Sequence, residues 1–558
     1  MPRRLAAVPI VALGWLTAWG APGDVTPAPA GSERVERWGR FEAAFESSVG
    51  YDDPLHDLER FAVRFVSPTG RARAVPGFWD GARLFKVRFS PDEEGAWTWE
   101  TDCSDSTNAG LHGVRGAFVC APPSRPQPIY RRGAIVRPRG ADHLSHADGT
   151  PFFWAACTAW NGALKSTDEE WEAYLSHRAR AGYTAIQFVA TQWRGGAADA
   201  TGDVAFEGAG RIRIRPSFFQ RLDRKVDRVN AHGLVAAPVL LWALQTGPGR
   251  ELSPGYYLPE PEAILLARYM VARYGAHHVV WILGGDGKYV GEYEQRWKTI
   301  GRGVFGGEHA GVVAMHSRGR SWIGREYALE DWLDVIGYQT GHGDDSAVVD
   351  WTTKGPVSQD WPRLPARPTI NMEPCYEQIA AGRIDAADVR RASYWSLLAA
   401  PVAGISYGAN GVWPWLRQLG EPILNHRPGP GSSPWHEGIR LPGSVQVGHL
   451  ARFVQQLEWW TLRPAPELLV EQPGDRVPDE FVSVVKSGDH RTILAYLPGP
   501  VRARIRPPLR PPYALRYFDP VAGEYLPGSR ATREPVVELL SPFPHDAVAV
   551  LTAVRDGG

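Results

Sequence analysis

The segments LVAAPVLLW (residues 234–242), PEAILLARYMVARYG (261–275) and VVWILGG (279–285) decide the expected fold of this chain. The first and third are continuous apolar runs of strand length, and the middle one has helical periodicity and closes on Gly275. Continuous apolar strands are buried on both faces, which is typical of parallel sheets covered by helices. The three segments therefore predict two parallel strands joined by a helix.

The same alternation extends in both directions along the middle of the chain. Helical segments separate most of the apolar runs, and two of them, residues 166–182 and 217–233, end at glycines. The eight apolar runs cover residues 152–156, 185–191, 234–242, 279–285, 311–317, 334–340, 369–374 and 402–408. Eight such units fit an α/β fold of the closed (β/α)8 type, a TIM barrel, better than an open doubly wound sheet, and no GxGxxG motif follows the first run.

The two flanks of this region have a different pattern. They contain short segments of alternating polar and apolar residues with turn residues about every eight to twelve positions, which predicts β-sandwiches. A proline-rich segment, APPSRPQP (121–128), separates the first flank from the barrel region. We expect a signal peptide at 1–25, an N-terminal β-sandwich at 32–122, the barrel at 127–460 and a C-terminal β-sandwich at 462–555.

The N-terminus has the composition of an export signal. Arg3 and Arg4 precede an apolar run from Leu5 to Trp19, and small residues follow. The run is shorter than the ~20 apolar residues of a membrane helix, so a cleaved signal is favoured over a retained anchor. We therefore expect a secreted or periplasmic protein with no integral membrane span after signal cleavage.

Charge and cysteine content exclude several classes of protein. Lysine plus arginine and aspartate plus glutamate are equal at 61 each, which argues against a nucleic-acid partner. There is no CxxC pair and no HExxH motif, so we expect no metal site and no required cofactor. Cys103 and Cys120 could be bridged in an exported protein or remain free, whereas Cys157 and Cys375 are expected to be buried thiols. The sequence contains no signal for a particular oligomeric state.

Candidate functional residues follow the apolar runs. In a (β/α)8 barrel the active site lies at the C-terminal ends of the strands, so polar and aromatic residues at these positions are candidates. They are Trp160, Asn161, Gln192, Trp193, Trp242, Asp286, His316, Gln339, His342, Glu373 and Trp413.

Two carboxylates in this set suggest a chemistry. Asp286 ends the fourth unit and Glu373 the seventh, and these strands lie across the barrel mouth from each other. Cleavage of a glycosidic bond needs one carboxyl to protonate the leaving oxygen and a second to attack the anomeric carbon or activate water. We assign Glu373 as nucleophile and Asp286 as acid/base, with Tyr376 or Glu377 orienting Glu373. The alternative is that such an acid caps a helix or pairs with an arginine, and for Glu377 this alternative is favoured.

Aromatic residues support a carbohydrate ligand. Of the 23 tryptophans, five lie at predicted loop positions where an indole could stack on a sugar ring: Trp160, Trp193, Trp242, Trp413 and Trp415. About half of the tryptophans should instead fill cores, above all Trp154, Trp281 and Trp395, which lie inside apolar runs. His316 and His342 could bind sugar hydroxyls or be structural histidines. A serine hydrolase is disfavoured because there is no GxSxG motif, and no histidine base is indicated beside Cys375.

Five motifs resemble one known family. They are HADGTPFFWAACTAW (146–160), WILGGDG (281–287), GYQTGHG (337–343), INMEPCYE (370–377) and SYGANGVWPW (406–415). Together they are similar to the apiosidase-like glycoside hydrolases, and the resemblance extends over about residues 35–553. It implies a (β/α)8 enzyme acting on side chains of plant or microbial polysaccharides, preceded by a β-sandwich and followed by a sandwich of the collagen-binding type.

The resemblance also implies roles for individual residues. Asp286 would be the acid/base and Glu373 the nucleophile of a retaining enzyme, and the sugar pocket would be lined by Gln339, His342, Tyr376 and Trp413. One position differs, because the family's first strand leads into an Asp-Thr-x-Trp pattern where this chain has Cys157. This difference removes an acid expected beside the sugar and leaves the sugar's identity open. The competing hypothesis is a non-catalytic carbohydrate- or matrix-binding protein built on a degenerate barrel.

Overall fold

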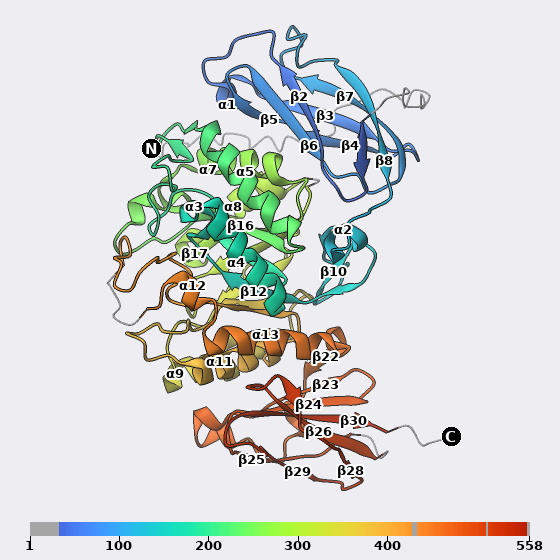
Figure 1. Cartoon of the computed structure of the whole chain (residues 1–558), viewed down its shortest axis with the longest axis vertical. Helices are drawn as coiled ribbons and strands as arrows, with labels where there is room; N and C mark the ends of the chain where they lie inside the picture. The colour runs from blue at the N-terminus through green and yellow to red at the C-terminus, as the bar shows by residue number, and fades with distance from the viewer. Residues whose placement is uncertain (1–32, 308, 427–431, 509–511, 555–558) are drawn as a thin grey trace, which may run out of the picture.

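The computed structural model describes residues 33–307, 309–426, 432–508 and 512–554. The predicted signal peptide lies outside these residues. Figure 1 shows the chain as three parts along its longest axis, with sheets at both ends and a helix-covered barrel between them. Among the described residues, no helix combines the length and the apolar character that a membrane crossing requires.

The middle part is a closed barrel of eight parallel strands, which confirms the predicted fold class. Each strand overlaps one of the eight apolar runs, and the pairing of β12 with β21 closes the ring. In order around the barrel the strands are β12 (Trp154–Thr158), β13 (Ala185–Val189), β16 (Val235–Trp242), β17 (Val280–Gly287), β18 (Val312–Ser317), β19 (Val335–Gln339), β20 (Thr369–Glu373) and β21 (Gly404–Tyr407).

Helices connect most of these strands on the outside of the barrel. The longer ones are α4 (Asp168–Ala181), α5 (Pro216–Ala231), α7 (Glu260–Tyr274), α8 (Glu294–Phe305), α9 (Ser346–Lys354), α10 (Pro356–Asp360), α11 (Ala386–Leu398) and α13 (Pro442–Gln455). A capping box at Thr167 and Glu170 opens α4, and Gly182 ends it with a φ of 95°. Residues 318–334, between β18 and β19, form turns and contain no helix.

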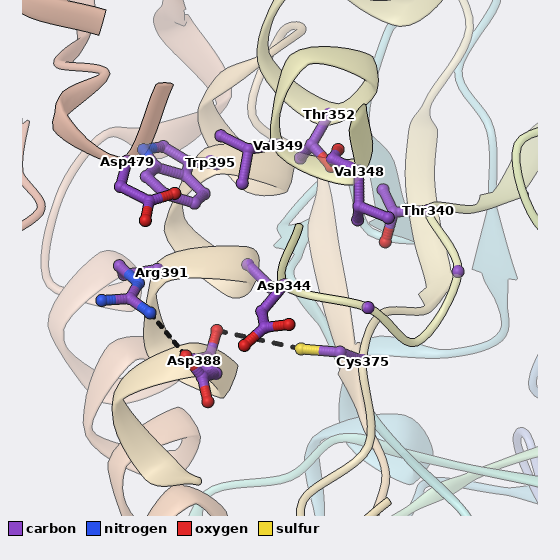
Figure 2. Close-up of a pocket in the computed structure, with 13 residues that line it drawn as sticks. Thr340, Asp344, Val348, Val349, Thr352, Cys375, Asp388, Arg391, Trp395 and Asp479 are labelled. Atoms are coloured by element: carbon purple, nitrogen blue, oxygen red, sulfur yellow. Dashed lines mark hydrogen bonds and ion pairs between the residues drawn. The ribbon is translucent and has the colours of Figure 1, made fainter. Parts of the chain in front are cut away.

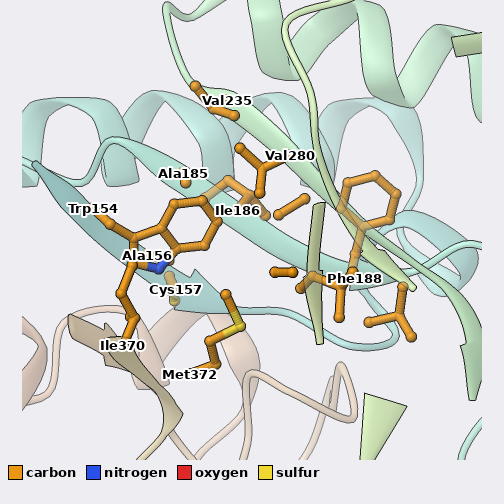
Figure 3. Close-up of a cluster of buried hydrophobic side chains, with 14 of the residues drawn as sticks. Trp154, Ala156, Cys157, Ala185, Ile186, Phe188, Val235, Val280, Ile370 and Met372 are labelled. Atoms are coloured by element: carbon orange, nitrogen blue, oxygen red, sulfur yellow. The ribbon is translucent and has the colours of Figure 1, made fainter. Parts of the chain in front are cut away.

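The barrel interior is filled by side chains from different strands. Figure 3 shows Trp154, Ile186 and Met372 meeting in one cluster, and each is fully buried. The indole N–H of Trp154 donates to Ser406 at 3.1 Å, so this polar atom is satisfied inside the core. Trp281 is also fully buried and Trp395 is 4% exposed, as expected for core tryptophans. The barrel is therefore solid below its C-terminal rim.

Short elements complete the connections. They are α2 (Pro128–Arg132), β9 (Ile135–Val136), β10 (Leu144–His146), β11 (Pro151–Phe152), α3 (Gly162–Lys165), β14 (Phe206–Glu207), β15 (Arg213–Ile214), α6 (Pro254–Tyr257) and α12 (Trp435–Gly438).

The N-terminal part consists of two sheets packed on each other. One has the order β1–β8–β7–β3–β4 and the other β2–β6–β5. Their core is aromatic, with Phe41 stacked on Phe118 and Phe65 stacked on Phe89. The elements are β1 (Arg34–Glu36), β2 (Phe41–Glu46), α1 (Pro54–Asp57), β3 (Phe61–Val66), β4 (Ala72–Pro76), β5 (Phe78–Gly81), β6 (Leu84–Phe89), β7 (Gly95–Cys103) and β8 (Arg115–Ala121).

Cys103 and Cys120 are free thiols in this part. Cys120 lies opposite Gly95 at the start of β7, whereas Cys103 is the last residue of the same strand. The eight residue steps between positions 95 and 103 span about 26 Å at ~3.3 Å per residue. A disulfide requires Cα atoms within ~7 Å, so this pair is not bridged.

The C-terminal part also consists of two sheets. The larger has the order β22–β23–β24–β30–β26–β27, with β28 paired to β26, and the smaller pairs β25 with β29. The strands are β22 (Leu462–Pro464), β23 (Ser483–Ser487), β24 (Thr492–Leu497), β25 (Arg502–Ile505), β26 (Tyr513–Asp519), β27 (Glu524–Tyr525), β28 (Arg530–Thr532), β29 (Val537–Leu540) and β30 (Ala547–Ala553).

Buried ion pairs fasten both flanking parts to the barrel. On the N-terminal side, Arg88 of β6 and Arg273 of α7 both donate to Asp223 of α5 at 2.7 Å. On the C-terminal side, Arg390 of α11 donates to Asp546, just before β30, at 2.6 Å. Arginine forks match carboxylates in two-point contacts, so these pairs fix orientation as well as distance.

Candidate active site

The C-terminal ends of neighbouring strands bring four titratable side chains together. Asp286 lies near the end of β17, His316 near the end of β18, His342 just after β19, and Glu373 at the end of β20. The predicted strand-end positions of the two carboxyls thus converge on one site. The site is built on strands, which hold side chains more rigidly than loops do.

Glu373 is held by two histidines. Its Oε1 lies 3.0 Å from Nε2 of His342, and its Oε2 lies 3.1 Å from Nε2 of His316. The residue is 6% exposed, and burial alone would raise its pKa. The contacts of Glu373 with His316 and His342 outweigh burial and hold the pKa of Glu373 well below its usual range. Glu373 is therefore an ionised carboxylate at neutral pH.

Asp286 has the opposite electrostatic character. Burial, and next the negative charge of Glu373, raise the pKa of Asp286 to about 7. Its backbone has a φ of 51°, a left-handed conformation that side-chain-bearing residues rarely adopt. The flanking Gly285 and Gly287 have no room for a side chain, because an added Cβ would lie within 2.7 Å of neighbouring atoms. The local sequence GGDG thus permits a tight turn of the strand that presents this carboxyl.

Aromatic rings surround the histidines. The indole N–H of Trp160 donates to the hydroxyl of Tyr376 at 2.8 Å, and the Trp160 ring lies 5.5 Å from the ring of His316. The Tyr376 ring lies 4.6 Å from that of His342. Burial, followed by the charge of Glu373, raises the pKa of Tyr376 well above its usual range, so the phenol keeps its proton. These rings limit the water around Glu373.

Two residues predicted to bind substrate are instead used by the protein itself. Asn161 is fully buried, donates to the carbonyls of Gly195 and Pro414, and accepts from the indole of Trp193. Gln192 donates to the carbonyl of Phe206 and accepts from the amide of Ala205. Their polar atoms already have partners within the protein, and a sugar-binding role for Asn161 and Gln192 stays a prediction.

Other predicted residues retain groups that a ligand could use. The indole N–H of Trp242 is buried and has no hydrogen-bond partner among the described residues. Gln339 ends β19 and is 5% exposed. Trp242 packs against Trp193 with ring centroids 4.3 Å apart. Trp413 is 6% exposed, and its N–H already donates to Asn410. Trp160 and Trp413 can therefore offer ring surface but no free N–H.

Trp415 and Glu377 lie outside this site. Trp415 is fully buried and stacks on Trp435 with ring centroids 4.7 Å apart, so its predicted sugar-stacking role is wrong. The Glu377 carboxylate accepts from the Tyr407 hydroxyl at 2.6 Å and from the backbone N–H of Gly443 at 3.0 Å. Glu377 therefore ties the segment after β20 to the first turn of α13, in agreement with the structural role favoured for it.

Cys157 does not face the site. It is fully buried, and its Sγ lies 3.8 Å from the guanidinium of Arg178, which is part of α4. The side chain thus occupies the layer between the barrel and its helices. The expectation that this position affects sugar recognition is wrong, because an aspartate here would meet Arg178 rather than the substrate.

A small cavity behind the His342 loop is not the substrate site. It has a volume of about 20 Å³ and is lined by residues from α9, α11, the loop and the segment after β20, including Asp344, Cys375 and Asp388 (Figure 2). This volume is enough for about one water molecule. Burial raises the pKa of Cys375 to about 12, so its thiol is not a nucleophile at neutral pH.

Two residues near the carboxyls were missed by sequence reasoning. Arg194 contributes positive charge near Asp286, and its guanidinium donates to the carbonyl of Asn425 at 3.0 Å. His426 packs on Trp413 with ring centroids 4.8 Å apart, and burial lowers its pKa to about 4. Arg194 directly follows Trp193 at a predicted strand end, so its position could have indicated it. His426 lies in a long connection with no such signal.

Within the described residues, no group of three or more His, Cys, Asp or Glu side chains could hold a metal ion.

Comparisons with known proteins place this geometry in a family. The profile described as "Apiosidase-like, catalytic domain" matches residues 139–461, more than half of the chain. A "Domain of unknown function (DUF5060)" matches residues 34–104. No curated protein matches.

Solved structures share the fold. A glycoside hydrolase family 5 protein from Bacteroides vulgatus is 19% identical, with a TM-score of 0.66 over 76% of this chain and 94% of that one. A second protein from Bacteroides vulgatus, provisionally described as a glycoside hydrolase, is also 19% identical, with a TM-score of 0.68 over 94% of this chain and 100% of that one. At this identity the likeness extends to the fold alone.

Proposed function

This chain belongs to the apiosidase-like glycoside hydrolase family, and we propose that it cleaves a glycosidic bond in a side chain of a plant or microbial polysaccharide, with Glu373 as nucleophile and Asp286 as acid/base. The family membership makes it a glycoside hydrolase. The proposal concerns its substrate, its catalytic residues and the stereochemical course.

The observation that carries this assignment is geometric: Asp286 and Glu373 lie at the C-terminal ends of β17 and β20, where Glu373 contacts both His316 and His342. The pKa values of the two carboxyls agree with this assignment. Asp286 has a pKa of about 7 and therefore holds a proton in mildly acidic solution, whereas the pKa of Glu373 is kept well below its usual range. Two carboxyls whose environments push their pKa values apart can act as acid and as nucleophile at the same pH. The contrasting partners of the two groups support these roles.

The proposed reaction has two steps. Glu373 attacks the anomeric carbon with a carboxylate lone pair, the glycosidic bond breaks, and Asp286 transfers its proton to the departing oxygen. Asp286, now ionised, accepts a proton from water, whose oxygen attacks the same carbon and breaks the ester to Glu373. Two inversions give net retention, and both residues return to their starting states.

The alternative of a non-catalytic binding protein has lost its main support. It rested on Cys157 as a missing acid of the site and on the two flanking sandwiches, and Cys157 lies beside Arg178 between the barrel and α4. We therefore propose an enzyme with a complete pair of carboxyls.

The test uses protein lacking the first ~25 residues, a typical signal length. A panel of plant and microbial polysaccharides, together with nitrophenyl glycosides, is assayed for released sugar with the wild type, D286N and E373Q. We expect release by the wild type, loss of release in both variants, and retained binding of the same glycan. Unchanged release in either variant would contradict the assignment.

We also propose that the protein is exported, on the basis of the N-terminal Arg3 and Arg4 and the apolar run that follows them. Sequencing the N-terminus of protein isolated from its native host tests this. A mature N-terminus near residue 25 is expected, and one at Met1 in the cytoplasmic fraction would contradict export.

A further inference from the structure

His316 lies between the two proposed catalytic residues. It belongs to β18, its backbone is in register with Gly285 of β17, and its side chain is fully buried. Nδ1 of the ring lies 3.2 Å from the backbone N–H of Asp286, and Nε2 lies 3.1 Å from Oε2 of Glu373. A single imidazole therefore contacts the backbone that carries the acid and the carboxylate that carries out the attack.

These contacts fix which nitrogen of His316 carries the proton. A backbone N–H can only donate, so Nδ1 must act as the acceptor from Asp286. The ring proton then lies on Nε2, which faces Glu373. Nε2 of His316 and Oε2 of Glu373 are both buried, neither has a hydrogen-bond partner among the described residues, and the two atoms face each other 3.1 Å apart. A second proton on Nδ1 would break the contact with Asp286.

The contact with Asp286 matters because its backbone is strained. A φ of 51° is unfavourable for an aspartate, and the pairing of β17 with β18 is irregular on both sides of Gly285. The backbone amide of Asp286 donates a hydrogen bond to Nδ1 of His316. It holds the turn in the conformation that presents the carboxyl.

The other histidine of the site differs in exposure. His342 contacts the opposite oxygen of Glu373, and 31% of its side chain is exposed, whereas His316 has no exposed surface. The other charged or titratable groups near Glu373 and Asp286 include Arg194, His426 and Tyr376. Substrate can reach His342, but it cannot reach His316 without displacing the rings around it.

We propose that His316 is a positioning residue that, as a neutral Nε2–H imidazole, sets the orientation of Glu373 and of the strained Asp286 turn without touching substrate. The inference rests on the proposed function for its kinetic consequences only. It replaces the sugar-binding role expected for His316 from the sequence.

Two substitutions separate the two contacts. In H316N the side-chain oxygen can occupy the place of Nδ1 and accept from Asp286, but the side chain is too short to reach Glu373. In H316Q the amide nitrogen can occupy the place of Nε2 and donate to Glu373, but no acceptor remains for Asp286. H278Q is a matched control, because His278 is also buried but contacts the carbonyl of Trp38, away from the site.

With the nitrophenyl glycoside that the panel identifies, both His316 variants should lose about 100-fold in kcat with little change in KM, because misplacing a catalytic group by ~1 Å costs that much. The acid limb of kcat/KM should move to higher pH in H316N, where Glu373 loses a donor, but not in H316Q. H278Q should leave the acid limb unchanged. A raised KM with an unmoved acid limb in H316N, or an equal shift in H278Q, would overturn the proposal.

A spectroscopic measurement tests the inference independently of activity. In wild-type protein labelled with 15N-histidine, the ring signals of His316 are assigned by their loss in H316Q. We expect one proton at neutral pH, located on Nε2. A proton on Nδ1, or on both nitrogens, would overturn the inference even if the enzyme is active, whereas the expected tautomer in a protein that releases no sugar would contradict only the proposed function.

Discussion

Two clusters of buried carboxylates in this protein have opposite partners. Asp223, between the N-terminal sheets and the barrel, accepts from two arginines, Arg88 and Arg273. Glu373, at the barrel mouth, faces two histidines, and Asp286 has no hydrogen-bonded cation among the described residues. Asp223 and Glu373 are both buried. Arginine is always charged and keeps its carboxylate partner ionised. Histidine and a neighbouring carboxyl can gain or lose a proton during a reaction.

The largest expected effect separates the clusters by activity. E373Q removes the attacking oxygen and should lower kcat on the order of 10⁴-fold, as removal of a nucleophile does in other enzymes. D223N should leave kcat unchanged per folded molecule, because Asp223 lies at the outer interface of the barrel. Initial rates normalised to the folded fraction by circular dichroism check both. Comparable losses of kcat in E373Q and D223N would contradict the distinction between a catalytic and a structural carboxylate.

Stability should show the reverse order. Removing one partner of a buried ion pair costs about 3–5 kcal/mol, so D223N should lower the free energy of unfolding by about that amount. The pKa of Asp286 is 3.8 in the unfolded reference and about 7 in the folded protein, so the folded state binds its proton more tightly. This carboxyl therefore destabilises the fold increasingly as the pH rises between these values.

D286N should accordingly be as stable as the wild type at low pH and more stable above about pH 7. Urea unfolding followed by tryptophan fluorescence at several pH values measures both variants. A D286N protein that is less stable than the wild type above neutral pH would show that Asp286 is a structural carboxylate after all.

The pH dependence of kcat/KM should follow from the same two groups. Activity requires Glu373 ionised and Asp286 protonated, so it should fall as the pH rises through about 7, and the acid limb should lie below the usual glutamate pKa of 4.5. Initial rates with a nitrophenyl glycoside across the acidic and mildly basic range test this. Constant activity well above neutral pH would contradict a protonated Asp286.

The smallest expected effect concerns Arg194. Its charge lowers the pKa of Asp286 after burial and Glu373 have raised it. R194Q should therefore raise the pKa of Asp286 and move the basic limb of kcat/KM upward by less than about one pH unit. R516Q, in the C-terminal sheet, is a control that should leave this limb in place. A downward shift in R194Q would show that the guanidinium does not act on Asp286.

The barrel and the strand-end positions of its two carboxyls could be predicted from the sequence. The eight apolar runs correspond to the eight strands because parallel strands buried on both faces need continuous apolar residues. Asp286 and Glu373 could be found because strand ends define the working face of a barrel. The absence of a helix in residues 318–334, between β18 and β19, was not predicted. Turns whose backbone groups bond to each other have no marked hydrophobic periodicity in the sequence.

The direction of individual polar side chains could not be predicted. Asn161 and Gln192 occupy strand-end positions, as Gln339 does, but their amides satisfy backbone groups of nearby loops. Which partner an amide finds depends on loops that are distant in sequence, such as the segment containing Pro414. Cys157 was misassigned for the same reason, since one residue's shift along a strand turns a side chain from the barrel interior to the helix layer.

The link between Glu377 and α13 has a consequence for the chain as a whole. Four positions after Glu373, the carboxylate of Glu377 binds α13, the helix that leads into the last sheets. The helix that follows the strand of Glu373, α11, binds Asp546 near the C-terminus. A chain that ended after the barrel would leave Arg390 without its partner Asp546 and would weaken the packing of the segment that carries Glu373. The C-terminal sheets therefore support the part of the barrel that carries Glu373, and an isolated barrel would lack this support.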